Sequence, residues 1–118
     1  MNRNKIKGKI GEEKAKNYLL NKGYKILKTN YRNKIGEIDI IAEDGKYIVF
    51  VEVKTRTNTA FGYAFEAVNY LKQKRIMKVF LAFLKQEGIN NRQVRYDIIE
   101  VYLQEETKIN HIENAFCL

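Results

Sequence analysis

The sequence contains no proline, and its single cysteine, Cys117, lies next to the C-terminal residue. Without proline, turns must be made by glycine, asparagine and aspartate. One cysteine can form neither an internal disulfide nor a thiolate cluster, so we do not expect structural zinc. His111 is the only histidine. Because it has no second histidine or cysteine cluster to join, we expect it to serve a surface or packing role.

Long apolar runs are also absent. No segment of about 18 apolar residues is present, and the N-terminal residues MNRNKIKGKIGEE lack the apolar core of a secretory signal. We therefore expect a cytoplasmic protein without a membrane partner. The chain has 118 residues, of which 45% are hydrophobic, so residues 1–118 should form a single domain.

Charge is unevenly distributed along the chain, which carries a net charge of +8. Residues 1–36 contain eleven Lys or Arg against Glu12 and Glu13, whereas residues 37–118 contain eleven against twelve acids. Clustered cations gain affinity for polyanions by releasing counterions from phosphates, so a nucleic acid is a natural partner. A solubilising surface would explain the same excess, and charge alone leaves both interpretations open.

Hydrophobic periodicity predicts short alternating elements. The expected elements are a helix over 9–22, a strand over 24–29, strands over 37–42 and 46–54, a long helix over 63–85 and a strand over 94–103. Asp44-Gly45 is a strong hairpin signal between the second and third strands. The final HIENAFCL could form a short helix or an edge strand. The order αβββαβ predicts an α/β fold, with a mixed central sheet flanked by helices.

The register of this hairpin decides which side chains share a face. If Asp44 and Gly45 are the central turn residues, Asp39 lies opposite Phe50 and Glu37 opposite Glu52. Glu37, Asp39, Glu52 and Lys54 then share one face. Ile38, Ile40, Val49, Val51 and Val53 would lie on the other face and pack against a helix. A slip of one residue would send Asp39 and Glu52 to opposite faces.

Three carboxylates on one small patch repel each other and call for a positive charge among them. Lys54 is one candidate. Mg²⁺ is a better one, because it selects oxygen ligands and keeps several waters. Such an ion can promote phosphodiester hydrolysis, with a nearby lysine stabilising the developing charge. An exposed strand salt bridge between Glu52 and Lys54, worth less than about 1 kcal/mol, is the alternative. The combination of acidic strand, tight turn and apolar strand ending in Glu-x-Lys favours the metal.

These residues also carry a family resemblance. GEIDIIA at 36–42, followed by FVEVKTR at 50–56, resembles the signature of the YraN-like family in the PD-(D/E)XK nuclease superfamily, which is similar to archaeal Holliday junction resolvases. The match covers nearly the whole chain. It begins at Gly11-Glu12, continues through Asn30-Tyr31-Arg32, Lys72 and Tyr96-Asp97, and ends at Asn114-Ala115-Phe116. The resemblance implies a restriction-endonuclease-like fold.

The resemblance also implies roles for individual residues. Asp39 and Glu52 correspond to the metal-binding carboxylates, Lys54 to the catalytic lysine, and Glu12 to an additional helical acid at the metal. Glu12 could instead complement the dipole of the first helix. The superfamily's Pro-Asp pair is Ile38-Asp39 here, which weakens the superfamily motif but keeps the acid. Glu37 has no role in the pattern and could support the site or bind Arg32 or Arg56.

The implied activity is cleavage of DNA, with branched or structured DNA as one candidate substrate and Mg²⁺ or Mn²⁺ as the cofactor. The expected phosphate-binding residues are Lys72, Arg56, Arg32 and Lys9. Cutting a four-way junction would need two active sites and therefore a homodimer. A basic nucleic-acid-binding module with the nuclease fold but little activity is the main alternative. A subunit that binds an acidic protein partner is a weaker one.

Overall fold

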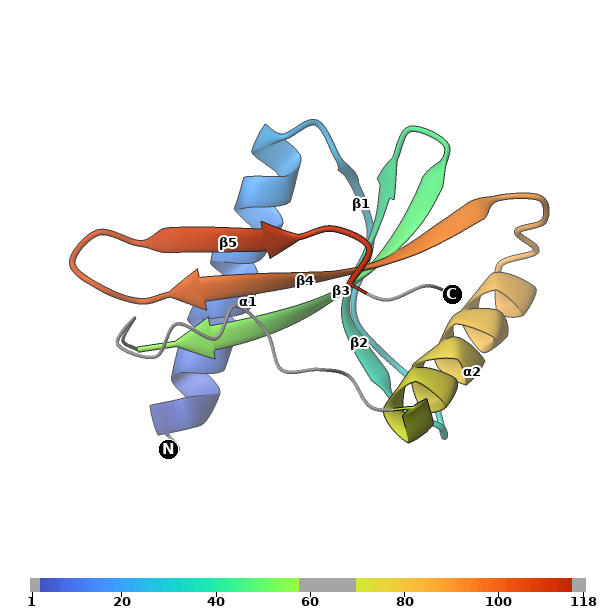
Figure 1. The fold of residues 1–118 in the computed structure, drawn as a ribbon, viewed down its shortest axis with the longest axis horizontal. Coiled ribbons are helices and arrows are strands. Elements are labelled where there is room, and N and C mark those ends of the chain that lie inside the picture. The colour runs from blue at the N-terminus through green and yellow to red at the C-terminus, as the bar shows by residue number, and fades with distance from the viewer. Residues whose placement is uncertain (1–2, 58–69, 116–118) are drawn as a thin grey trace.

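The protein is described here from a computed structural model, which covers residues 3–57 and 70–115 (Figure 1). Helix α1 spans Arg3–Asn21 and helix α2 spans Tyr70–Gln86. The strands are β1 (Lys25–Arg32), β2 (Glu37–Asp44), β3 (Tyr47–Arg56), β4 (Gln93–Tyr102) and β5 (Lys108–Ile112). Neither helix, over these residues, is long and apolar enough to cross a membrane.

The five strands form one mixed sheet in the order β1-β2-β3-β4-β5. Strands β1, β2 and β3 pair antiparallel, β3 and β4 pair parallel, and β5 returns antiparallel to β4. A parallel pair needs a crossover connection, and α2 lies in the one between β3 and β4. The α/β fold with a mixed sheet and flanking helices is therefore confirmed. Of the C-terminal HIENAFCL, His111 and Ile112 belong to the edge strand β5, residues 113–115 belong to no helix or strand, and residues 116–118 lie outside the described residues.

Each face of the sheet is covered by one helix, and Figure 1 shows α1 passing behind β3, β4 and β5. The α2-side core contains Phe50, Phe80 and Tyr96, with the Phe50 and Phe80 rings stacked at a centroid distance of 3.8 Å. The α1-side core contains Leu19 and Val51. Because β3 is buried on both faces, its sequence is a nearly continuous apolar run up to Glu52.

The predicted register of the β2–β3 hairpin is wrong. Gly45 and Lys46 form the turn, with Gly45 at φ 56°, and Asp44 pairs with Tyr47. The pairing is thus displaced by two residues from the prediction. Because side chains alternate with a period of two, this displacement keeps Asp39 and Glu52 on the same face. It also makes them neighbours, since they follow the Ile40–Val51 pair.

The predicted separation of one charged and one apolar face is also wrong. Ile48 and Phe50 lie on the same face as Glu52, and both are buried in the α2-side core. Ile38 belongs to this core as well, whereas Ile40 is buried on the α1 side. Charged residues therefore lie at both ends of the hairpin, Glu43 and Asp44 next to the turn and Asp39 and Glu52 away from it, with the buried apolar residues between them.

Element boundaries differ modestly from the predicted ones. Helix α1 begins at Arg3, six residues before the expected start, because the polar RNKIKG segment has helix-compatible residues and no proline. Strand β1 continues to Arg32, and the Asn33 side chain then accepts hydrogen bonds from the N–H groups of Ile35 and Gly36. Residues 63–69 of the expected long helix lie outside the described residues.

Gly11 allows α1 to approach the end of β3. A Cβ atom at this position would overlap the hydroxyl of Thr55. Gly8, one turn earlier in the same helix, has no neighbour within 4 Å of such an atom. The glycine at position 11 therefore sets the distance between α1 and β3, and with it the location of the adjacent Glu12.

We expect Gly11→Ala and Gly8→Ala to change stability in opposite directions. Gly11→Ala should lower the free energy of unfolding by about 1–3 kcal/mol, because the new methyl group overpacks against Thr55. Gly8→Ala should raise it by up to about 1 kcal/mol through helix propensity alone. Urea unfolding followed by circular dichroism measures both. Equal effects of the two substitutions would contradict the close approach at Gly11.

Candidate metal centre

Asp39 and Glu52 meet where β2 and β3 diverge. Asp39 lies near the start of β2, and its Oδ2 accepts a hydrogen bond of 2.8 Å from the backbone N–H of Val53. This bond takes the place of a ladder hydrogen bond and holds the carboxylate against β3. The divergence of the strands therefore leaves room for side chains that a closed ladder would exclude.

Two small hollows open at this point, and Asp39 lines both. The hollow on the α1 side has a volume of about 190 Å³ and is also lined by Lys9 and Glu12. The hollow on the α2 side has a volume of about 230 Å³ and is lined by Glu37 and Glu52. The structure thus brings acidic side chains from α1, β2 and β3 around Asp39.

These carboxylates influence each other. Burial, together with the negative charges of Glu12, Glu52 and Glu37, raises the pKa of Asp39 to about 6, although the Val53 hydrogen bond acts in the opposite direction. Burial and the charge of Glu37 also raise the pKa of Glu12, against the effect of Lys9. The ionised form of Asp39 is therefore disfavoured by its burial and by the acids around it.

Glu52 is contacted by three side chains from three elements, through one hydrogen bond and two ion pairs. Its Oε1 accepts a hydrogen bond of 2.6 Å from the Tyr96 hydroxyl on β4 and lies 3.7 Å from Lys72 Nζ on α2. Its Oε2 lies 3.7 Å from Lys54 Nζ. Burial and the adjacent charge of Glu52 raise the pKa of Tyr96, so this phenol stays protonated and donates.

The remaining predicted cations lie at different distances from this cluster. Lys9 lines the α1-side hollow. Arg32 is paired with Glu37 at 2.9 Å, which is one of the partners that the sequence suggests for Glu37. Arg56 lies 3.7 Å from Glu100 on β4. The structure therefore groups Lys9, Lys54 and Lys72 with the acids, whereas Arg32 and Arg56 are paired with glutamates beside the cluster.

Tyr96 is a contributor that the sequence analysis did not assign. It is almost completely buried, at 1% exposure, yet its hydroxyl reaches Glu52. The Tyr96-Asp97 pair stands out in the sequence, but no local pattern connects it with β3, because the parallel pairing of β3 and β4 joins distant segments. Only that pairing could have indicated its role.

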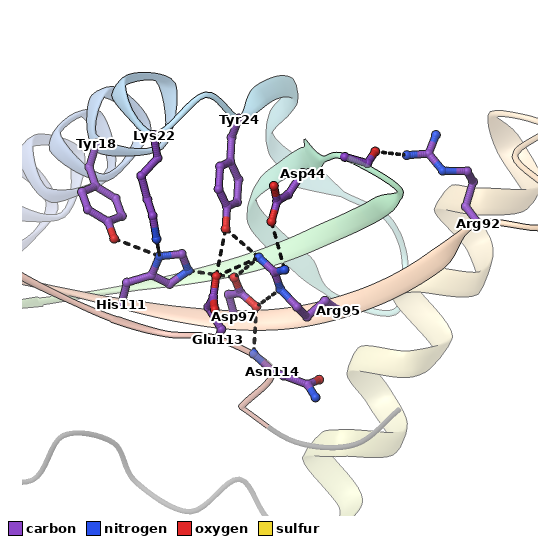
Figure 2. A network of polar contacts seen from close by, with 11 residues as sticks. Tyr18, Lys22, Tyr24, Asp44, Arg92, Arg95, Asp97, His111, Glu113 and Asn114 are labelled. Carbon is purple, nitrogen blue, oxygen red and sulfur yellow. Dashed lines mark hydrogen bonds and ion pairs between the residues drawn. The ribbon is translucent and has the colours of Figure 1, made fainter.

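A second polar cluster lies on the opposite face of β4, and Figure 2 shows Arg95 of β4 and His111 of β5 meeting at Asp97, with Tyr18 of α1 bonded to His111. Asp97 is fully buried and accepts two hydrogen bonds from Arg95, at 2.9 and 3.0 Å. His111 Nε2 lies 2.7 Å from its Oδ2, and the N–H of Asn114 donates to its Oδ1. Burial alone would raise the pKa of Asp97, but these hydrogen bonds outweigh burial and lower it.

Part of this second cluster has the composition of a metal site. Asp97, His111 and Glu113 each offer a ligand atom, and these atoms lie within 4.8 Å of one another, so the group could bind a metal ion. Arg95, however, already bonds Asp97 and lies 3.5 Å from Glu113. A cation would have to enter beside this guanidinium, at a cost in repulsion. The side chain of His111 is only 4% exposed, so of the two roles expected for it, surface or packing, the structure shows packing, against the polar partners Tyr18 and Asp97.

A model of the uncharacterised protein family UPF0102 matches residues 11–101, a range that includes Glu12, Asp39, Glu52 and Lys54. A UPF0102 protein of Clostridioides difficile is 55% identical over 96% of this chain and 98% of its own length. One from Caldanaerobacter subterraneus is 50% identical over 95% of each chain. Among solved structures, SfsA of Pyrococcus furiosus in complex with Ca²⁺ matches with 17% identity and a TM-score of 0.39, over 93% of this chain and 63% of SfsA.

We expect Asp39→Asn to stabilise the metal-free protein at neutral pH. The pKa of Asp39 is raised from 3.8 to about 6, so folding disfavours its ionised form above pH 6, and this cost disappears as the pH falls from 6 towards 3.8. Asparagine removes the charge and can still accept from Val53. The free energy of unfolding should rise by about 1–3 kcal/mol at pH 8 and be unchanged near pH 4. Urea unfolding in EDTA across this range measures it, and a pH-independent gain would contradict the argument.

Asp97→Asn should instead destabilise the protein strongly. It would leave Arg95 buried without its main counter-ion, at a cost of about 3–5 kcal/mol in the free energy of unfolding. Asp44→Asn is the matched control, since Asp44 also pairs with Arg95, at 3.1 Å, but its side chain is 40% exposed. Its effect should stay below about 1 kcal/mol. Similar losses for the two variants in urea unfolding would show that Asp97 does not anchor this cluster.

Proposed function

The chain belongs to the uncharacterised protein family UPF0102, and we propose that it is a metal-dependent endonuclease of the PD-(D/E)XK type that acts on DNA. The observation that carries this proposal is the grouping of Glu12, Asp39 and Glu52 around two adjoining hollows, with Lys54 beside them. Asp39 lies among these acids, and its burial together with their negative charges raises its pKa to about 6.

The chemistry of this donor set fits a hard divalent cation. Carboxylate oxygens from separate elements are the ligands that Mg²⁺ and Mn²⁺ take, with water completing the shell. Asp39 and Glu52 would hold the ion, with Glu12 as a further ligand from α1. Their mutual repulsion supports this assignment, because a cation would lower the raised pKa of Asp39 and remove the cost of its charge. A bound ion would supply Lewis acidity toward a phosphoryl oxygen.

The neighbouring side chains have distinct tasks in this proposal. Tyr96 keeps the Glu52 carboxylate in one orientation through its hydroxyl, as second-layer donors do for metal ligands. Lys54, 3.7 Å from Glu52, carries a positive charge to stabilise the negative charge that develops on the phosphate. Lys72 approaches Glu52 from α2 and can contact a phosphate next to the one that is cut.

The charge distribution supports a nucleic acid as the substrate. The excess of cations lies in residues 1–36, which include α1 and β1, and Lys9 reaches the α1-side hollow. Phosphate contacts of this kind bind without reading the sequence. Action on DNA agrees with the cytoplasmic location expected from the sequence. If the substrate is a four-way junction, two copies of the chain would act together, since each contributes one such centre.

The proposal predicts metal-dependent cleavage that requires Asp39 and Lys54. End-labelled linear, single-stranded, flapped and four-way-junction DNA should be incubated with Mg²⁺ or Mn²⁺. Asp39→Asn and Lys54→Ala should each lower the cleavage rate by at least about 100-fold, since the first removes a charged ligand of the metal ion and the second removes a positive charge beside the reacting phosphate. Asp44→Asn and Lys46→Ala, on the same hairpin, are matched controls and should cut at nearly the wild-type rate.

Metal binding can be measured in the same samples. Mg²⁺ or Mn²⁺ should raise the melting temperature of the wild type, because the ion binds only the folded chain, and the shift should be absent in Asp39→Asn. Binding of DNA without cutting, unchanged by either substitution and by metal, would overturn the nuclease proposal. That result would favour the basic nucleic-acid-binding module instead.

A further inference from the structure

The α1-side hollow is one end of a longer groove. A larger hollow of about 690 Å³ runs between α1 and β1, and the two hollows share Lys16 and Thr29 in their walls. We call the pair the α1–β1 groove. It begins at Asp39 in the candidate metal centre and reaches Tyr24 and Lys25, at the far end of β1.

Cations dominate the walls of this groove away from the metal centre. Its lysines are Lys9, Lys16, Lys25 and Lys28. Its acids besides Asp39 are Glu12 and Glu13, which lie at the metal end, and Glu13 is paired with Lys16 at 3.4 Å. The wider part of the groove therefore has positive charge without lining acids, which suits a polyanion.

Apolar surface lies between these cations. Leu20 on α1 is 47% exposed, and Ile26 on β1 is half-buried. Leu27 also borders the groove, but it packs against the α2-side core. Alternating cations and apolar side chains suit an unpaired polynucleotide strand, which presents phosphates along one side and the faces of its bases along the other. A duplex hides its base faces by stacking and offers only phosphates.

A protein strand fits this groove poorly, although β1 is an edge of the sheet. The pairing of β1 is irregular between Ile26 and Lys28, and Asn30 has a left-handed conformation with φ 52°. Lysines at 25 and 28 add charge along the same edge. Bulges and edge lysines are the features by which proteins prevent another strand from pairing. They leave the charge and the apolar surface of the groove unaffected.

We propose that the α1–β1 groove binds an unpaired strand of DNA that continues from the phosphate at the metal centre. This inference rests on the proposed function and narrows its substrates to DNA with a single-stranded segment, such as a flap or an overhang. Duplex on the other side of the cut would lie outside the groove. Lys25 and Lys28 contact phosphates several nucleotides from the cut.

Binding measurements without metal test the groove separately from cleavage. Fluorescence anisotropy in EDTA should compare a 15-nucleotide single strand with a duplex of the same length. Lys25→Gln/Lys28→Gln removes two charges from the groove. Lys85→Gln/Lys108→Gln removes two exposed charges elsewhere and serves as the matched control. Circular dichroism confirms that both double variants fold.

The groove variant should bind the single strand about tenfold more weakly. Its slope of log K against log salt concentration should also fall by about 1.4, since each lost phosphate contact on a single strand contributes about 0.7. The control variant should bind the single strand within about twofold of the wild-type affinity. The two double variants should bind the duplex with equal affinity. Leu20→Ser should weaken single-strand binding with no change in the salt slope.

Several results would overturn the inference: equal losses in the two double variants, an equal loss on duplex and single strand, or no single-strand binding by the wild type. These results concern binding in the absence of metal and do not test cleavage. If the wild type cuts DNA in a metal-dependent way while the groove variant binds single strands normally, the nuclease proposal holds and the groove inference fails. If no DNA is cut but binding depends on Lys25 and Lys28, the groove holds and the nuclease proposal fails.

Discussion

The parallel pairing of β3 with β4 is the constraint on which the rest of the structure depends. It aligns ten residues of each strand, from Tyr47–Gln93 to Arg56–Tyr102, and it requires a crossover that carries α2 to one face while α1 covers the other. With both faces covered, β3 can be apolar on both sides up to Val51. Charge is tolerated only where this cover ends, which is where Glu52 and Lys54 lie.

Strand β4 connects the two polar clusters through adjacent residues. Tyr96 points to one face and holds Glu52, and Asp97 points to the other and binds Arg95 and His111. In the second cluster the buried carboxylate of Asp97 is hydrogen-bonded directly to Arg95 and His111, as a buried charge must be if it is to stabilise a fold. In the first cluster Asp39 accepts a hydrogen bond from the backbone of Val53 and lies among the charges of Glu12, Glu37 and Glu52. This difference between Asp97 and Asp39 is the main physical reason for assigning stability to the Asp97 cluster and chemistry to the Asp39 cluster.

Much of the fold could be predicted because it depends on local patterns. Apolar residues at helical spacing indicated both helices, and the Asp44-Gly45 signal indicated the hairpin, although Gly45 and Lys46 form its turn. The prediction that Asp39 and Glu52 share a face holds despite this error, because a displacement of two residues preserves the alternation of side chains. Their direct adjacency could not be predicted, since it depends on a single turn conformation.

The sequence by itself determined the element types, the mixed α/β class and the pair of acids with a lysine on one hairpin. Each of these depends on residues close together in the chain. Only the tertiary structure decided that Tyr96 holds Glu52, 44 residues away, that Tyr18 meets His111 across 93 residues, and that α1 and β1 enclose a basic groove. Such contacts depend on the order of the strands in the sheet and on how closely the helices pack against it. Residues that are close together in the sequence do not specify this order.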